Sequence, residues 1–190
     1  MKHNYLTWTI GSLVMAVLIY FYYNELSLMH VQQESSLAFG AIYKSSIINV
    51  EVRSGDRSYS LFNANPVKKD IYHAQPVFSD SADLAAWVAR GINSQEIKPP
   101  QIDNILGVLV GLTFDVQIPP EMISNEPEAL GLKPPQAVVS INYIGSSETL
   151  QIGNLHKHGD KRYALLSSRA GVFIIPEKSI AAVLAPVSAR

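Results

Sequence analysis

The chain has 190 residues, with 15 lysines and arginines against 16 aspartates and glutamates, so its formal net charge is −1. Both signs are interspersed without a basic stripe, which gives no electrostatic support for nucleic-acid binding. The absence of cysteine excludes a disulfide scaffold, thiolate catalysis and a cysteine-ligated metal.

The first predicted element is an uncharged run over residues 5–23, YLTWTIGSLVMAVLIYFYY. A helix of this length spans roughly 28 Å, close to the ~30 Å hydrocarbon core of a bilayer. The sequence therefore predicts a single transmembrane helix. Aromatic side chains favour the headgroup region, and the residues expected to contact the two membrane interfaces are Tyr5, Trp8, Tyr20, Phe21, Tyr22 and Tyr23.

Two other interpretations of this segment compete with a retained anchor. A cleaved secretory signal would have a shorter apolar core and a small-residue cleavage site, whereas this run ends in bulky aromatic residues. A buried core helix is the other alternative, and the absence of a polar face argues against it. Lys2 precedes the helix and Glu25 follows it, so the positive-inside rule places residues 1–4 in the cytoplasm and residues 24–190 outside.

The segment after the anchor divides into a linker and one domain. Residues 24–44 are predicted as a juxtamembrane linker that extends the helix, and residues 45–190 as an extracytoplasmic domain. Alternating apolar residues predict strands over 45–53 and 59–62, joined as a hairpin. A third strand is predicted over 67–73.

The apolar spacing then changes from the period of a strand to that of a helix. Leu84, Trp87 and Val88 recur at helical spacing, which predicts a helix over 82–92 with Leu84 and Trp87 in the core. A second, well-buried helix is predicted over 101–112, after a pair of prolines.

The rest of the chain is predicted to be rich in strands and to close with a helix. The order of strands, helices, strands and helix favours an α+β fold of antiparallel strands with two to three packed helices. The pattern leaves open whether the strands form one sheet or two. The expected strands cover 114–118, 137–143, 149–152, 162–166 and 172–175, and the closing helix covers 177–184 after a proline.

Two glycines have structural roles in this pattern. Residues 126–130 are expected to form one helical turn that stops at Gly131 in the left-handed conformation, so that Leu132 packs back. Gly153 is expected to permit a bulge or a tight bend in its strand.

Four segments together resemble the bacterial DUF4340 family: EPEALGLKPPQAVVSI (126–141), ETLQIGN (148–154), KRYALLSS (161–168) and GVFIIPEKSIAAVL (171–184). The order and spacing are similar, although Leu130 stands where an aromatic residue usually precedes Gly-Leu. The resemblance implies a bacterial protein anchored in the cytoplasmic membrane with a periplasmic domain. Some relatives resemble accessory proteins of ABC-type export or gliding-motility systems, and the family implies no catalytic residues.

Candidate chemistry in the chain is sparse. The cluster of His156, His158 and Asp160 is the one that most resembles a metal site, but zinc needs three or four ligands and a solvated turn is the simpler interpretation. Acidic residues near position 125 lack the paired geometry of general acid–base catalysis. No nucleophile elbow or phosphate-binding loop occurs. The acidic residues near position 125 are Glu121, Glu126 and Glu128. The sequence therefore predicts no catalytic residue, cofactor or metal.

These features favour a non-catalytic accessory or scaffold subunit of a larger membrane complex. Its expected partners are the lipid bilayer and other integral membrane subunits, and not nucleic acid. The alternative is a membrane-tethered binding module for a glycan, peptide or lipid, with Tyr143, Tyr163 and Phe173 lining a groove. A hydrolase that uses scattered serine, histidine and aspartate residues is a third hypothesis.

Overall fold

The computed structural model describes one domain and very little of the segment that precedes it. No helix among the described residues is long and apolar enough to cross a membrane. Apart from Met15, the predicted anchor lies outside the described residues, and so do its six aromatic residues. Residues 67–85 are also outside them. The described residues are 15, 37–40, 42–66, 86–91, 97–123, 127–157 and 159–188.

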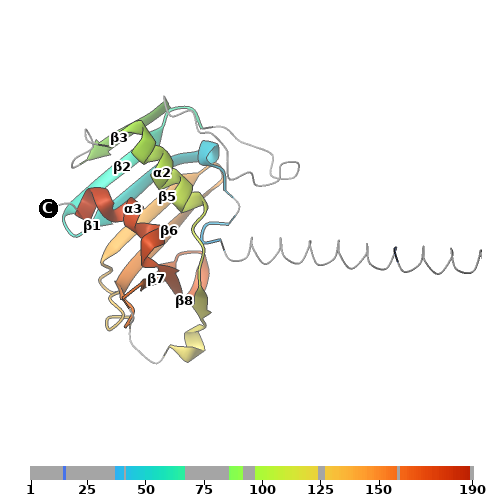
Figure 1. The fold of residues 1–190 in the computed structure, drawn as a ribbon, viewed down its shortest axis with the longest axis vertical. Helices are drawn as coiled ribbons and strands as arrows, with labels where there is room; N and C mark the ends of the chain where they lie inside the picture. The colour runs from blue at the N-terminus through green and yellow to red at the C-terminus, as the bar shows by residue number, and fades with distance from the viewer. Residues whose placement is uncertain are drawn as a thin grey trace, which may run out of the picture. The chain divides into compact units, whose positions relative to one another are not determined.

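The described strands form one antiparallel eight-stranded sheet in the order β3-β2-β1-β5-β6-β7-β8-β4 (Figure 1). Pairing between β1 and β5 joins the strands of the first third of the domain to those of the last third. The sheet therefore resolves the alternative of one sheet or two that the sequence left open. Its strands are β1 (Ile47–Ser54), β2 (Arg57–Asn63), β3 (Trp87–Gly91), β4 (Val116–Ile118), β5 (Ala137–Tyr143), β6 (Ser146–Leu155), β7 (Lys161–Leu166) and β8 (Arg169–Pro176).

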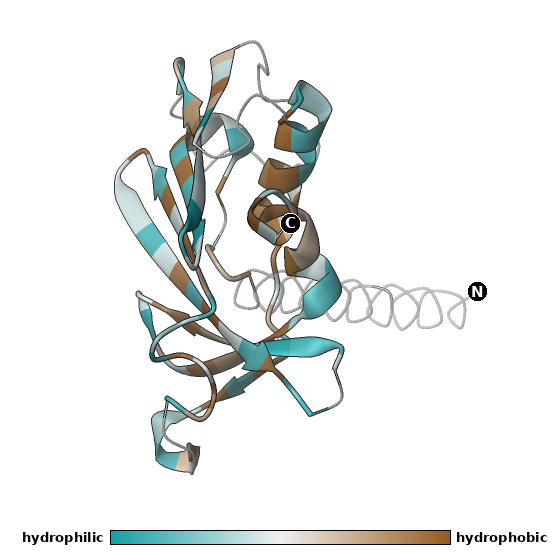
Figure 2. Ribbon diagram, turned by 90° about the vertical axis from the view of Figure 1, so that its left-hand side faces the viewer, coloured by the Kyte–Doolittle hydropathy of each residue, from teal (hydrophilic) through white to brown (hydrophobic). Residues whose placement is uncertain are grey.

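Two α-helices cover one face of this sheet, which we call the inner face (Figure 2). They are α2 (Pro99–Val110) and α3 (Glu177–Ser188). Of the two short 3-10 helices, η1 (Lys44–Ser46) precedes α2 in sequence and η4 (Pro120–Met122) lies between α2 and α3. Pro99 and Pro100 occupy the first turn of α2, where a missing backbone N–H costs no hydrogen bond. The coarse prediction of an α+β domain with antiparallel strands and packed helices is confirmed.

The predicted helix over 82–92 is wrong for its described part. Trp87–Gly91 forms strand β3, and its five residues pair with Tyr59–Asn63 of β2. The apolar spacing fitted a helix, but the backbone hydrogen bonds of β2 compete for this segment. Gly91 adopts φ +112°, which ends any helical path there. Trp87 is buried, as expected, whereas Val88 is 45 % exposed.

The main core lies between the inner face and the two helices. Side chains alternate across a strand, so every second residue of the central strands reaches this layer. The predicted buried face of α2 is confirmed by Ile102, Ile105, Leu106 and Leu109. From the sheet the core takes Val50, Val52, Leu61, Val139, Ile141, Leu150, Ile152, Ala164, Phe173 and Ile175, and from α3 it takes Ile180, Val183, Leu184 and Val187.

The expected roles of the two glycines are confirmed. Gly131 has φ +67° and its N–H donates to the Glu128 carbonyl at 3.0 Å, while Leu132 is buried. The register of β6 against β7 shifts after Ile152, which marks a bulge at Gly153. A Cβ on Gly153 would overlap the carbonyl oxygen of Leu130, so the glycine lets the loop before β5 lie directly against β6.

Candidate interaction surface

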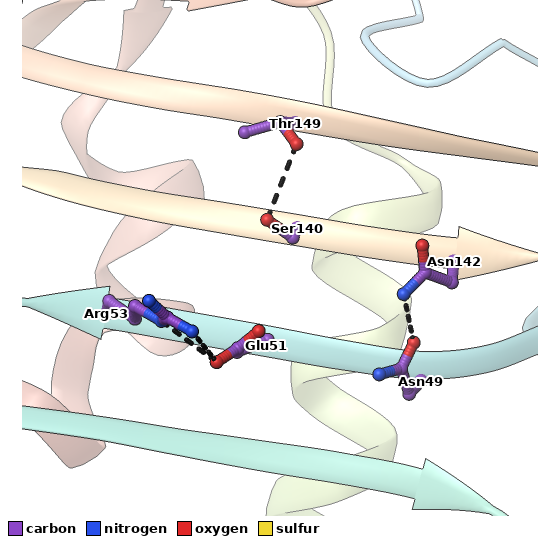
Figure 3. A network of polar contacts seen from close by, with 6 residues as sticks. All are labelled: Asn49, Glu51, Arg53, Ser140, Asn142 and Thr149. Carbon is purple, nitrogen blue, oxygen red and sulfur yellow. Dashed lines mark hydrogen bonds and ion pairs between the residues drawn. The ribbon is translucent and has the colours of Figure 1, made fainter.

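The face of the sheet opposite the helices has two halves of different chemistry. Over β1, β5 and the start of β6 it carries a set of polar side chains, which we call the outer polar face (Figure 3). These residues alternate with core residues such as Val50, Val139 and Leu150, which point to the inner face. The outer polar face consists of Asn49, Glu51, Arg53, Ser140, Asn142 and Thr149.

Hydrogen bonds between side chains order this surface. Arg53 donates from Nε and Nη2 to Oε1 of Glu51, at 2.9 and 2.6 Å. The Asn142 amide donates to Oδ1 of Asn49 at 2.5 Å, and the hydroxyls of Ser140 and Thr149 lie 3.4 Å apart. Exposed ion pairs contribute little to stability. The network therefore orders a hydrogen-bonding surface and adds little to the stability of the fold.

Two exposed apolar side chains adjoin the outer polar face. Phe62 of β2 and Val88 of β3 are directly paired across the two strands, and they are 44 % and 45 % exposed. Phe62 is also paired with Asn49 of β1. An apolar pair beside ordered polar groups is the mixture found in protein interfaces, in which an apolar centre has a polar rim.

The other half of the same face is covered by the chain itself. Tyr163, Leu165 and Val172 alternate with core residues of β7 and β8, so they lie on the face opposite the helices. Leu130 and Leu132, from the loop before β5, pack on them in a second, smaller apolar cluster. This cover stops short of β1 and β2, and among the described residues it leaves the outer polar face open.

The least exposed of the described ion pairs connect the two helices to neighbouring elements. Arg162 of β7 donates to both carboxylate oxygens of Glu177 in the first turn of α3, and to the Gly153 carbonyl at 3.2 Å. Lys44 of η1 contacts Oδ1 of Asp103 in α2 at 2.7 Å. An acidic residue in the first turn also suits the helix dipole. Each of these charged side chains is paired with one of opposite charge, which favours a structural role for them.

One further ion pair lies at the surface. Nζ of Lys161 is 3.0 Å from Oδ2 of Asp115. The hydrogen bond to Asp115, and then its charge, raises the pKa of Lys161. A lysine held in its charged form is a poor general base, so this pair gives no support to proton-transfer chemistry.

Tyr59 is the most deeply buried titratable side chain of β2. Its hydroxyl donates to the Val183 carbonyl of α3 at 2.7 Å, and burial raises the pKa of the phenol. The desolvation cost falls on the charged form. Tyr59 is therefore a neutral tie between sheet and helix.

Sequence reasoning overlooked Glu148, a buried carboxylate at the start of β6. It lies opposite Ile141 and accepts a hydrogen bond from Oγ of Ser167 at 3.0 Å. Oγ of Ser167 in turn accepts from the Thr149 backbone N–H at 2.9 Å. The spacing of Glu148 two residues before Leu150 is the signal that places it on the inner face. Its partners tie the turn after β7 to β6.

The three aromatic residues predicted to line a groove do not share one surface. Phe173 is fully buried on the inner face and stacks on Phe114 with 4.1 Å between ring centroids. Tyr163 lies in the smaller cluster on the opposite face, beside His156 at 5.5 Å. Tyr143 packs at the edge of the main core. A groove built from these three is ruled out.

The described candidate metal and acid–base residues do not form a metal-binding cluster. Within the described ranges, no three histidine, aspartate or glutamate side chains lie close enough to hold a metal, and His158 is outside those ranges. Glu121 is exposed in η4, and Glu128 lies 3.6 Å from Lys133 at the surface. Glu126 is not described. The membrane-contacting residues predicted in the anchor also lie outside the described residues.

Comparison with family models, with curated proteins and with solved structures found no match for this chain. The resemblance to the DUF4340 family therefore stays a prediction.

Proposed function

We propose that this chain is a non-catalytic accessory or scaffold subunit of a larger bacterial membrane complex. Residues 5–23 anchor it in the cytoplasmic membrane, and the α+β domain stands on the periplasmic side. The proposal combines the uncharged aromatic-flanked segment, the resemblance to a family of accessory proteins, and the open outer polar face with its apolar pair.

The outer polar face is the observation that carries this proposal. One half of the sheet surface is sealed by Leu130 and Leu132, while the other half leaves Phe62 and Val88 exposed beside ordered amides. A partner subunit can bury the apolar pair and satisfy the polar groups around it.

A co-purification experiment tests the proposal. The tagged full-length chain is extracted in mild detergent, and the integral membrane proteins that accompany it are identified. The variant Phe62→Asp is expected to lose them because it puts a charge into the apolar pair. Met122→Asp is the matched control, since Met122 is 74 % exposed on η4, away from this face. A wild-type chain that purifies alone, or a Phe62→Asp variant with undiminished partners, would contradict the proposal.

The alternative function, a membrane-tethered binding module, draws on the same surface. The amides of Asn49 and Asn142 are suited to sugar hydroxyls because, beside the hydrogen bond between them, the Asn49 N–H groups can donate and the Asn142 oxygen can accept. A thermal-shift screen against soluble glycans and peptides separates the two functions, because a bound ligand raises the unfolding temperature. A glycan that stabilises wild type but not Asn142→Ala would favour the binding module.

A further inference from the structure

Arg162 of β7 contacts helix α3 and strand β6 with a single guanidinium group. On the inner face, Nε and Nη2 donate to the two carboxylate oxygens of Glu177 in the first turn of α3 (Figure 2). The remaining nitrogen, Nη1, donates to the Gly153 carbonyl of β6 at 3.2 Å. Because the guanidinium is planar and all three of its nitrogens have acceptors, its position depends on α3 and on β6 together.

The peptide group between Gly153 and Asn154 extends this contact beyond β6. Its carbonyl accepts from Arg162, and its N–H donates at 2.8 Å to the Leu130 carbonyl of the loop before β5 (residues 127–135). The C=O and N–H of a trans peptide lie in one plane and point in opposite directions. The two residues fall in the register shift of β6, where neither is paired with β5 or β7. The orientation of one rigid plane therefore depends on both contacts.

The loop before β5 lies directly against this peptide group. A Cβ on Gly153 would be 2.4 Å from the Leu130 carbonyl oxygen, so backbone contacts backbone here. The side-chain amide of Asn154 also donates to the Ala129 carbonyl, at 3.4 Å. These contacts hold the part of the loop from which Leu130 and Leu132 cover the apolar half of the outer face. The position of this cover therefore depends on the bulge in β6.

We propose that Arg162 and the Gly153–Asn154 peptide group couple the first turn of α3 to the loop before β5. A displacement of α3 that withdraws Glu177 frees the guanidinium, lets the peptide plane rotate and weakens the hydrogen bond to Leu130. Hydrogen bonds that share a polar group strengthen one another, and chains of them can carry coupling between distant sites. The helix layer and the cover on the outer face thus move as one unit. This coupling does not depend on the membrane anchor or on the proposed accessory function.

Amide hydrogen exchange tests the coupling across the sheet. Glu177→Ala removes the carboxylate on the inner face and leaves every residue of the loop unchanged. In the full-length chain in mild detergent, peptides that cover 127–135 should exchange several-fold faster in this variant, whereas peptides of β1 (47–54) should keep the wild-type rate. Asp103→Ala is the matched control, because it removes the carboxylate partner of Lys44 in the other helix and should leave 127–135 unchanged. Wild-type exchange at 127–135 in Glu177→Ala, or a rise no larger than in β1 or in the control, would overturn the proposal.

A double-mutant cycle measures the same coupling in the stability of the domain. Leu130→Ala removes an apolar contact of the loop on the face opposite Glu177. If Glu177→Ala already loosens the loop, Leu130→Ala should change the unfolding equilibrium constant by a several-fold smaller factor in that background than in wild type. In the Asp103→Ala background the factor should equal that of wild type. Urea unfolding of the full-length variants measures these factors, and the same factor in all three backgrounds would contradict the coupling.

Discussion

At the scale of single residues, the described polar side chains mainly connect elements that are distant in sequence. Tyr59 ties β2 to α3, Arg162 ties β7 to α3, and Lys44 ties η1 to α2. Each of them joins the helix layer to the sheet or to the segment that leads into it. Most buried polar groups in proteins are hydrogen-bonded; Tyr59 is buried, Lys44 and Arg162 are half-buried, and all three have hydrogen-bond partners.

Tyr59 makes the stability of the domain fall as pH rises in the alkaline range. Because burial raises the pKa of the folded phenol, the unfolded chain loses this proton near pH 10 while the folded chain keeps it. The stabilisation is complete below about pH 10 and then falls with rising pH, by up to about 1.4 kcal/mol per pH unit. Tyr59→Phe should lack this contribution to the slope of the unfolding free energy against pH, measured by urea unfolding between pH 9 and pH 11. At pH 7 the variant should be about 1–2 kcal/mol less stable, since the Val183 carbonyl loses its partner. Identical pH slopes for the two proteins would contradict this assignment.

At the scale of elements, close approach of the backbone explains why Gly153 and Gly107 differ in whether they could carry a side chain. Gly153 lies where the loop before β5 crosses β6, and a side chain there would collide with the backbone of Leu130. Gly107 lies inside α2, where a Cβ would be 3.5 Å from Nζ of Lys44, an ordinary contact distance. One glycine is therefore required by packing, whereas the other only weakens its helix.

Alanine at these two positions should change stability in opposite directions. Gly153→Ala should lower the free energy of unfolding by about 1–3 kcal/mol because the added methyl group overpacks the crossing. Gly107→Ala should raise it by about 0.5–1 kcal/mol because glycine is a poor residue in a helix interior. Denaturant unfolding of both variants measures the difference. A Gly153→Ala variant as stable as wild type would show that the loop does not lie on β6.

Element-scale reasoning from sequence succeeded where the pattern was local. Strand β5 was predicted with its observed bounds, and the predicted helix over 101–112 overlaps most of α2. It failed at β3, where Leu84, Trp87 and Val88 suggested a helix. A five-residue strand contains too few alternations to outweigh a chance helical spacing. Pairing with β2, which is distant in the chain, decided its conformation.

At the scale of the whole molecule, the described hydrophobic core belongs to residues 37–190. The chain divides into one unit of residues 1–36 and a second of residues 37–190. All residues of the main core lie between Ala38 and Val187. The described part of the second unit thus has its own hydrophobic core, which is the condition for independent folding.

Removal of residues 1–36 should therefore separate folding from membrane attachment. The shortened chain is expected to be soluble without detergent and to unfold in one cooperative transition, because its core is intact. The full-length chain is expected in the membrane fraction after a high-salt wash, because an apolar helix of the predicted length inserts stably. Cell fractionation followed by thermal unfolding measures both properties. A full-length chain released by salt would contradict the predicted anchor.

The sequence by itself determined the elements with a strong local period, the left-handed stop at Gly131 and the bulge at Gly153. Their signals lie within a few residues and need no distant partner. The predicted anchor rests on the same kind of local signal and stays a prediction. Only the tertiary structure decided that the strands form one sheet, that Trp87–Gly91 is its edge, and that half of the outer face is covered. It also brought Glu148 to Ser167 and dispersed the three aromatic residues expected in a groove. These outcomes depend on strand pairing between distant segments, and backbone hydrogen bonds of this kind leave no periodic trace in the sequence.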